Sequence, residues 1–183
     1  MEVRELETEE GIRALYPVVR ELRAHLEDEE GFVAAVGRMR EAGYRIATAY
    51  RDGDGEGDPV GAAGFRVYEM LAYGKILYVD DLVTAEDARS GGVGRALIGW
   101  LEEEARGQGC TGLHLTSGVQ RAQAHRFYFR EGMAIYTSTS RKGSEKGVDP
   151  PYSSEYLEDA SCELRMAPAL FGWAPRGSSR VGA

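Results

Sequence analysis

The segment that most constrains the fold is a glycine-rich turn between an apolar run and an amphipathic helix. The turn reads Arg89-Ser90-Gly91-Gly92-Val93-Gly94-Arg95. The run before it, Ile76–Val83, is rich in β-branched and aromatic residues and predicts a strand. After the turn, apolar residues recur at helical spacing and predict a helix with one apolar face: Val93, Ala96, Leu97, Trp100, Leu101 and Ala105.

A strand that leads through glycines into a helix presents backbone N–H groups beside the positive end of the helix dipole, and this arrangement binds phosphate. Arg89 and Arg95 add cationic donors at the same place. The spacing excludes a Walker A loop, because no Gly-Lys-Ser/Thr run follows. It also excludes a dinucleotide fingerprint, because Leu97 stands where the third glycine belongs. The turn therefore predicts a site for a different phosphorylated cofactor.

Two motifs in this order identify a family resemblance. Arg89, Gly92 and Gly94 form an Arg-x-x-Gly-x-Gly pattern that resembles the pyrophosphate-binding motif of the GNAT superfamily of acyl-CoA-dependent N-acyltransferases. Downstream, Ala124–Met133 is similar to the second signature of that family, a helix that carries Phe-Tyr and ends at glycine plus an apolar residue. A strand is predicted between them over Thr111–Thr116. The resemblance is close over residues 76–138 and holds in outline over most of the remaining chain.

The remaining patterns follow the order β-α-α-β-β-β-α-β-α-β-β. Periodicity alone supports a mixed α/β domain, and the resemblance implies the GNAT fold: a mixed central sheet of about six to seven strands, with two splayed parallel strands and flanking helices. We expect one domain over residues 1–168 and a flexible tail over 169–183. Thr8 and Asp28 predict the starts of two N-terminal helices, Pro17 predicts a break in the first, and Ser161–Met166 predicts the last strand.

The resemblance implies acetyl-CoA as the cosubstrate. Backbone groups of Leu82 and Val83 would pair with its pantetheine arm, although both residues also fit a core strand. Arg121 stands where many family members carry asparagine, and an arginine there could reach a phosphate. The predicted cofactor-binding residues are Leu82, Val83, Arg89, Ser90, Gly91, Gly92, Val93, Gly94, Arg95 and Phe127.

Acyl transfer to an amine requires a group that accepts the ammonium proton and a donor for the leaving thiolate. Tyr128 is the candidate donor; the alternative is a half-buried tyrosine packed beside Phe127. Asp80 and Asp81 are the candidates on the amine side and resemble a Glu-Asp pair in polyamine-acetylating members of the family. Because adjacent strand residues point to opposite faces, we expect only one of the two to face the cleft. The alternative is that one of them braces a neighbouring loop.

Composition narrows the partners. The chain has 30 acidic and 22 Lys and Arg residues, a net charge of −8, which argues against a nucleic-acid partner and suits a basic acceptor. Cys110 and Cys162 form no disulfide framework, and without a leader or a long apolar span the chain is expected in the cytoplasm, with no membrane partner. The spacing of His25, His114 and His125 predicts structural roles and no metal site.

The leading interpretation is an acetyl-CoA-dependent N-acetyltransferase that acts on a small-molecule amine. The alternatives are a GNAT-fold enzyme that uses a protein amine or another acyl-CoA, and a module that binds acyl-CoA without turnover. Nothing in the sequence separates the first two, and a homodimer stays open.

Overall fold

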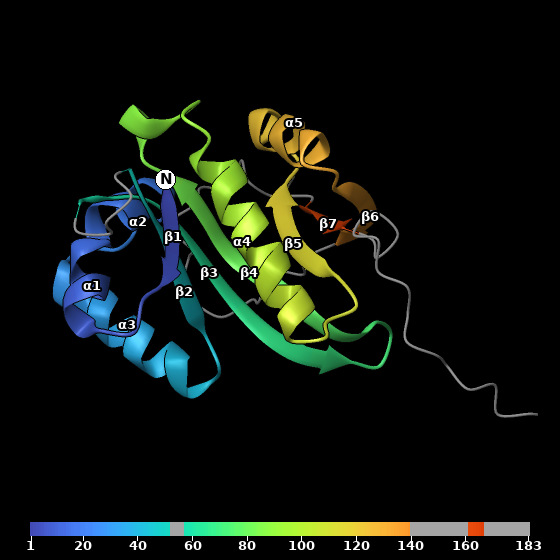
Figure 1. Cartoon of the computed structure of the whole chain (residues 1–183), viewed down its shortest axis with the longest axis horizontal. Coiled ribbons are helices and arrows are strands. Elements are labelled where there is room, and N and C mark those ends of the chain that lie inside the picture. Colours follow the sequence, from blue (N-terminus) through green and yellow to red (C-terminus); the bar gives the residue numbers. More distant parts are fainter. Residues whose placement is uncertain (52–56, 140–160, 167–183) are drawn as a thin grey trace, which may run out of the picture.

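The computed structural model describes residues 1–51, 57–139 and 161–166. Within these residues one seven-stranded sheet has the order β1-β2-β3-β4-β5-β7-β6 (Figure 1). β4 and β5 are parallel, and the other neighbours are antiparallel. The strands are β1 (Glu2–Glu5), β2 (Arg45–Tyr50), β3 (Pro59–Met70), β4 (Gly74–Thr84), β5 (Leu113–Gly118), β6 (Ala134–Thr139) and β7 (Ser161–Met166). The helices are α1 (Glu9–Ala14), α2 (Tyr16–Leu22), α3 (Glu29–Glu41), α4 (Val93–Gly107) and α5 (Ala122–Arg130), with a 3₁₀ turn at Glu86–Ala88.

The N-terminal helices begin where their capping residues predict. The Thr8 side chain accepts a hydrogen bond from the Gly11 N–H at 3.2 Å, and the Asp28 carboxylate accepts one from the Gly31 N–H at 2.6 Å. Pro17 stands in the first turn of α2, so the predicted break is confirmed between α1 and α2. These caps fix the residues at which α1 and α3 begin.

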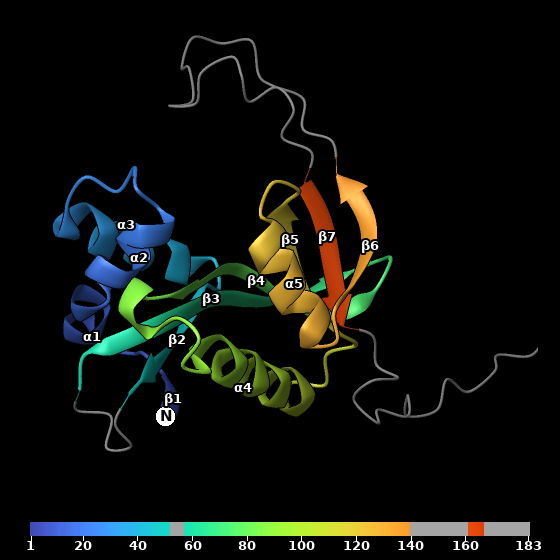
Figure 2. The same ribbon diagram turned by 90° about the horizontal axis from the view of Figure 1, so that it is seen from above.

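Helix α4 covers one side of strands β2–β4, and α2 and α3 lie on the other side (Figure 2). The buried face of α4 follows the predicted spacing, except that Ile98 is buried while Ala96 and Trp100 are half-buried. Trp100 packs edge-on against Phe65 of β3, with ring centroids 5.7 Å apart. On the side of the sheet that faces α4, the core continues into Leu113 and Leu115 of β5 and Leu164 of β7. One apolar layer therefore joins both halves of the sheet.

The centre of the sheet contains two irregularities in strand pairing. β4 and β5 pair only at Leu77↔Leu113, Tyr78↔His114 and Val79↔Leu115. On its other edge β4 slips against β3: Phe65 pairs with Val79 and Gly64 with Asp81, which leaves Asp80 as an extra residue, a β-bulge. The α/β class with parallel central strands and flanking helices is confirmed. The predicted tail, the segment 141–152 and most of the acidic loop 52–58 lie outside the described residues.

Candidate active site

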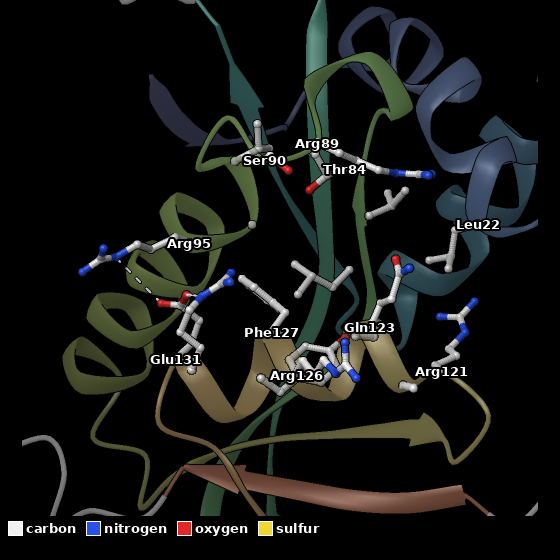
Figure 3. A pocket seen from close by; sticks show the side chains of 18 of the residues that line it. Leu22, Thr84, Arg89, Ser90, Arg95, Arg121, Gln123, Arg126, Phe127 and Glu131 are labelled. Carbon is white, nitrogen blue, oxygen red and sulfur yellow. Dashed lines mark hydrogen bonds and ion pairs between the residues drawn. The ribbon is translucent and has the colours of Figure 1, made fainter.

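A cleft of about 1360 Å³ lies between the end of β4, the first turn of α4 and helix α5 (Figure 3). It brings together Arg121 and ten of the predicted cofactor-binding and catalytic residues: Leu82, Val83, Arg89, Ser90, Gly92, Val93, Gly94, Arg95, Phe127 and Tyr128. Gly91 is outside this lining, and its N–H donates to the Ala88 carbonyl at 3.2 Å. Asp80 and Asp81 are also outside it. The cleft is therefore lined by the predicted cofactor-binding residues other than Gly91 and by Tyr128, but by neither Asp80 nor Asp81.

The glycine turn leaves the start of α4 open toward the cleft. Ser90 and Gly92 both have positive φ angles, 66° and 84°, and Gly92 is the N-cap of the helix. Because Gly92 has no side chain, no side-chain oxygen caps the N–H groups of the first turn. A Cβ on Gly94 would lie 3.0 Å from the Phe127 ring, so a glycine is needed where α4 approaches α5. These free donors fit a phosphate.

Arginines surround this turn. Arg89 pairs with Glu21 of α2 at 3.3 Å and with Glu86 at 3.7 Å, and Arg95 pairs with Glu131 at 3.8 Å. Three more arginines line the cleft from the start and body of α5: Arg121, Arg126 and Arg130 (Figure 3). The cleft thus has enough cationic donors for several phosphate groups.

Sequence reasoning missed part of this lining. Arg126 and Arg130 were not singled out, although they stand one before and three after Phe127 on the predicted second-motif helix. Helical spacing from Phe127 could have found Arg130, which stands three residues later, but not the adjacent Arg126. Arg130 lies over the Phe127 ring, with its guanidinium carbon 5.5 Å from the centroid. Glu21 and Leu22 carry no such signal, because α2 reaches the cleft only through the tertiary fold.

Tyr128 is the phenol of the cleft. Its side chain is 7% exposed and packs against Phe127 with ring centroids 5.4 Å apart. Burial raises the pKa of Tyr128, and Arg121 opposes that rise. Its hydroxyl has no hydrogen-bonding partner among the residues that the structure describes. The phenol is therefore protonated at neutral pH and can donate a hydrogen bond to a ligand.

Asp80 and Asp81 reach one cluster of side chains, which is defined by Arg23, Tyr44 and Arg66. Asp81 accepts hydrogen bonds from Arg23 Nε at 2.7 Å and from the Tyr44 hydroxyl at 2.9 Å. Asp80 accepts one from Arg66 Nε at 3.0 Å. The Arg66 guanidinium in turn lies over the Tyr44 ring, 5.5 Å from its centroid.

The expectation that these adjacent acids point to opposite faces is therefore wrong. The extra residue at the β-bulge breaks the alternation, so both carboxylates meet the same cluster. Their environments still differ. Asp80 lines a second cavity of about 440 Å³ together with Arg66, Tyr68 and Tyr78, whereas Asp81 does not. Burial raises the pKa of Asp80, and the Arg66 charge opposes the rise.

The histidines do not line the cleft. His114 is fully buried, and its Nδ1 lies 2.7 Å from Glu163 Oε1. His125 Nε2 lies 3.0 Å from the Gly118 carbonyl oxygen and 3.7 Å from Cys162 Sγ.

In the described part of the chain, no three His, Cys, Asp or Glu residues are grouped to hold a metal ion. None of the described helices is both long and apolar enough to cross a membrane.

Comparisons with known proteins agree with this geometry. An uncharacterized N-acetyltransferase of Bacillus subtilis, YhdJ, is 30% identical over 142 residues, which cover 76% of this chain and 96% of the relative. An aminoalkylphosphonate N-acetyltransferase of Salmonella typhimurium is 41% identical over 54 residues, which cover 30% of this chain and 35% of that protein. Among solved structures, a ribosomal-protein-alanine N-acetyltransferase of Brucella melitensis has a TM-score of 0.67 at 19% identity and covers 91% of this chain and 99% of that one.

The model of the acetyltransferase (GNAT) family matches residues 4–133, from β1 to the end of the second motif. This range contains the glycine turn, the arginines, the phenol and both acids described above. The matched range also contains the parallel strand pair at which the sheet opens. Together with the YhdJ relative, this match shows that the chain belongs to the GNAT family of acetyltransferases.

Proposed function

We propose that this protein transfers an acetyl group from acetyl-CoA directly to the primary amine of a small molecule. The observation that carries the proposal is the arrangement around β4. The cleft with Tyr128 adjoins Leu82, Val83 and Thr84, and the cavity with Asp80 adjoins the same strand just before them. Between the two, β4 and β5 no longer pair. A donor held in the cleft and an acceptor held in the cavity would meet at this opening.

The chain has the groups that acetyl-CoA needs. The free N–H groups at the start of α4, with Arg89 and Arg95, would hold its pyrophosphate. Leu82 and Val83 pair with β3 on one edge, and within the described residues the other edge of β4 has no strand partner beyond Val79. That edge would pair with the amides of the pantetheine arm as an added strand does. Bound acetyl-CoA supplies the thioester carbonyl carbon that the amine attacks.

Asp80 is the proton acceptor in this proposal. Asp81 holds the Arg23 and Tyr44 side chains in place beside it. The amine must lose its proton to attack the carbonyl, and a carboxylate with a raised pKa accepts that proton better than an ordinary aspartate. Asp81 is held from two sides by Arg23 and Tyr44, so its oxygens are already used. As the new C–N bond forms and the C–S bond breaks, the Tyr128 hydroxyl donates to the leaving thiolate.

The size of the second cavity favours a small acceptor. About 440 Å³ falls within the range of pockets that bind small molecules, roughly 300–1,000 Å³. The Salmonella relative is by its name specific for an aminoalkylphosphonate, a small amine. The Brucella neighbour is by its name specific for a protein N-terminus, so a peptide acceptor is the alternative to test.

The test is release of free CoA thiol from acetyl-CoA in the presence of small amines, aminoalkylphosphonates and peptides that begin with alanine. We expect rapid release with at least one small amine and background release with the peptides. Product masses should show the acetyl group on the amine nitrogen. Acetylation of peptides alone would overturn the small-molecule acceptor. Tight acetyl-CoA binding without any acetylated product would overturn catalysis.

A further inference from the structure

A row of polar side chains crosses the face of the sheet that is turned away from α4. Leu77, Val79, Leu113 and Leu115 belong to the core with α4, so alternation places Tyr78 and Thr116 on the opposite face. The Tyr78 hydroxyl donates to Thr116 Oγ1 at 2.7 Å. Thr116 is the register partner of Glu163 on β7. Three neighbouring strands thus contribute a phenol, a hydroxyl and a carboxylate to one row.

Within the described residues, Glu163 forms no ion pair with an arginine or lysine, although Arg165 stands two positions along the same strand. Asp80 pairs with Arg66 and Asp81 with Arg23. Glu163 instead contacts His114, whose ring is fully buried; burial lowers the pKa of His114, so the ring is neutral at neutral pH and donates through Nδ1. Among the described residues, the second carboxylate oxygen of Glu163 has no partner.

This arrangement has an energetic cost unless a ligand compensates it. The Glu163 side chain is only 15% exposed, and a carboxylate that is withdrawn from water without a cationic partner is destabilising. His114 fixes one oxygen at 2.7 Å and thereby orients the other. A charged group held in one orientation at a cost to stability is typical of a binding site.

Aromatic rings extend from this carboxylate toward Asp80. Tyr68 and Tyr78 lie with ring centroids 6.2 Å apart, both line the cavity that contains Asp80, and Tyr68 is 40% exposed. Burial raises the pKa of Tyr68, and the charges of Asp80 and Glu163 add to that rise. Exposed phenol rings between two carboxylates form a surface on which a cationic chain can lie.

The sheet sets the distance between the two acids. Asp80 on β4 and Thr116 on β5 stand one position past the last β4–β5 pair, and Glu163 is the partner of Thr116 on the next strand. Two spacings of paired strands amount to about 10 Å, which is the lower limit here because β4 and β5 no longer pair at this level. One extended, flexible amine could therefore reach both carboxylates.

We propose that Glu163, oriented by His114, binds a second cationic group of the acceptor while the reacting amine lies beside Asp80. The acceptor is then an amine with two cationic groups separated by about two strand spacings, roughly 10 Å. The reacting amine would be selected at Asp80 and the distal cation at Glu163. This inference rests on the proposed function for the identity of the reacting group, but the binding site itself can be tested without turnover.

The test compares hexamethylenediamine with hexylamine, which differ by one terminal ammonium. Calorimetric titration in the presence of CoA, which cannot transfer an acetyl group, should show the diamine binding about tenfold more tightly to the parent protein. In Glu163→Gln this difference should disappear, while hexylamine binding stays the same. Glu103→Gln is the matched control, because it removes the same charge from an exposed position on α4.

His114 has its own variant. His114→Leu removes the donor that orients Glu163, so the preference for the diamine should fall toward that of Glu163→Gln. Thermal unfolding checks that the variant folds. If it does not fold, the comparison of the parent protein with Glu163→Gln decides the inference. Equal binding of the two amines by the parent protein, or an unchanged preference in Glu163→Gln, would overturn the inference. A Glu163-dependent preference without thiol release from acetyl-CoA would support this site and count against the proposed function.

Discussion

The two sides of β4 are built in different ways. On the cleft side, the candidate phosphate-binding groups belong to one contiguous stretch from Arg89 to Arg95, and backbone N–H groups are their main component. On the opposite side, each acid is set by a side chain from a distant segment. Arg23 and Asp81 are 58 residues apart in the chain, and His114 and Glu163 are 49 apart. A site made from backbone can be found from sequence, whereas one made from long-range pairs cannot.

The largest expected effect tests the acid side. Asp80→Asn keeps the shape and removes the proton acceptor, so kcat should fall by roughly 10²–10⁴ with little change in acetyl-CoA affinity. Because a general base works when deprotonated, the activity of the parent enzyme should rise with pH through the raised pKa of Asp80. That acidic limb should be missing in the variant. Steady-state kinetics across pH measure both effects.

Asp81→Asn is the matched control for Asp80. Its carboxylate already binds Arg23 and Tyr44. Its loss should therefore lower the free energy of unfolding, while kcat falls less than in Asp80→Asn. An equal loss of kcat in both variants would remove the distinction between a proton acceptor and a positioning acid.

The next effect tests the phenol on the cleft side. Tyr128→Phe keeps the ring beside Phe127 and removes the hydroxyl, so kcat should fall by about 10²–10³, as for loss of an oxyanion donor. The affinity for acetyl-CoA should not change, because the thioester gains little from the phenol before the bond breaks. A thioester with a better leaving group should be less affected. Parent-level turnover in the variant would make Tyr128 a packing residue.

A smaller effect tests the backbone phosphate site. Gly92 has a φ of 84°, so valine there would be strained whatever its function, but asparagine and aspartate tolerate this conformation. Gly92→Asp and Gly92→Asn differ only in charge. We expect the aspartate variant to bind acetyl-CoA roughly tenfold more weakly than the asparagine variant, because its charge repels phosphate.

The stability of the two Gly92 variants should move in the opposite direction. An anionic side chain at the N-cap stabilises a helix, so the aspartate variant should unfold at the same temperature as the asparagine variant or a higher one. Calorimetry and thermal unfolding on one protein sample separate binding from folding. Equal acetyl-CoA affinity would argue against a phosphate at this turn.

The smallest effect concerns the packing that holds the acids in place. Tyr44→Phe removes the hydrogen bond to Asp81 and should cost about 1.5–3 kcal/mol of unfolding free energy, because the bond is buried and its acceptor is charged. Burial and then the charge of Asp81 raise the pKa of Tyr44, so the hydroxyl donates throughout the working pH range. Urea unfolding measures the cost.

Tyr50→Phe is the control for this hydrogen bond. Tyr50 is equally buried, and within the described residues its hydroxyl has no hydrogen-bonding partner, so the change should have little effect. Similar losses at both positions would mean that the Tyr44–Asp81 bond contributes little.

Local patterns were sufficient for the elements that depend on neighbouring residues. The turn at residues 89–95, the helix caps at Thr8 and Asp28, the break at Pro17 and the last strand at Ser161–Met166 are each determined by short-range chemistry. Backbone N–H groups and dihedral angles belong to the residue itself or to its near neighbours, so a short window contains the information.

The placement of the two acids shows where local patterns fail. Gly64 is the register partner of Asp81, and a Cβ there would overlap the Tyr44 hydroxyl, which is the group that binds Asp81. Gly64 of β3 has no side chain and so leaves room for Tyr44, the residue before β2. The residue types at Asp80 and Asp81 do not by themselves indicate the bulge at Asp80.

The sequence by itself determined the family, the order of the elements and the glycine turn that we propose as a phosphate site, because these follow from residues adjacent in the chain. Only the tertiary structure decided that both acids lie on one face, that Asp80 rather than Asp81 adjoins a cavity, and that Glu163 is paired with a neutral His114. The physical reason is that strand register and burial depend on partners tens of residues away. Those partners set the direction of each side chain and the cost of its charge.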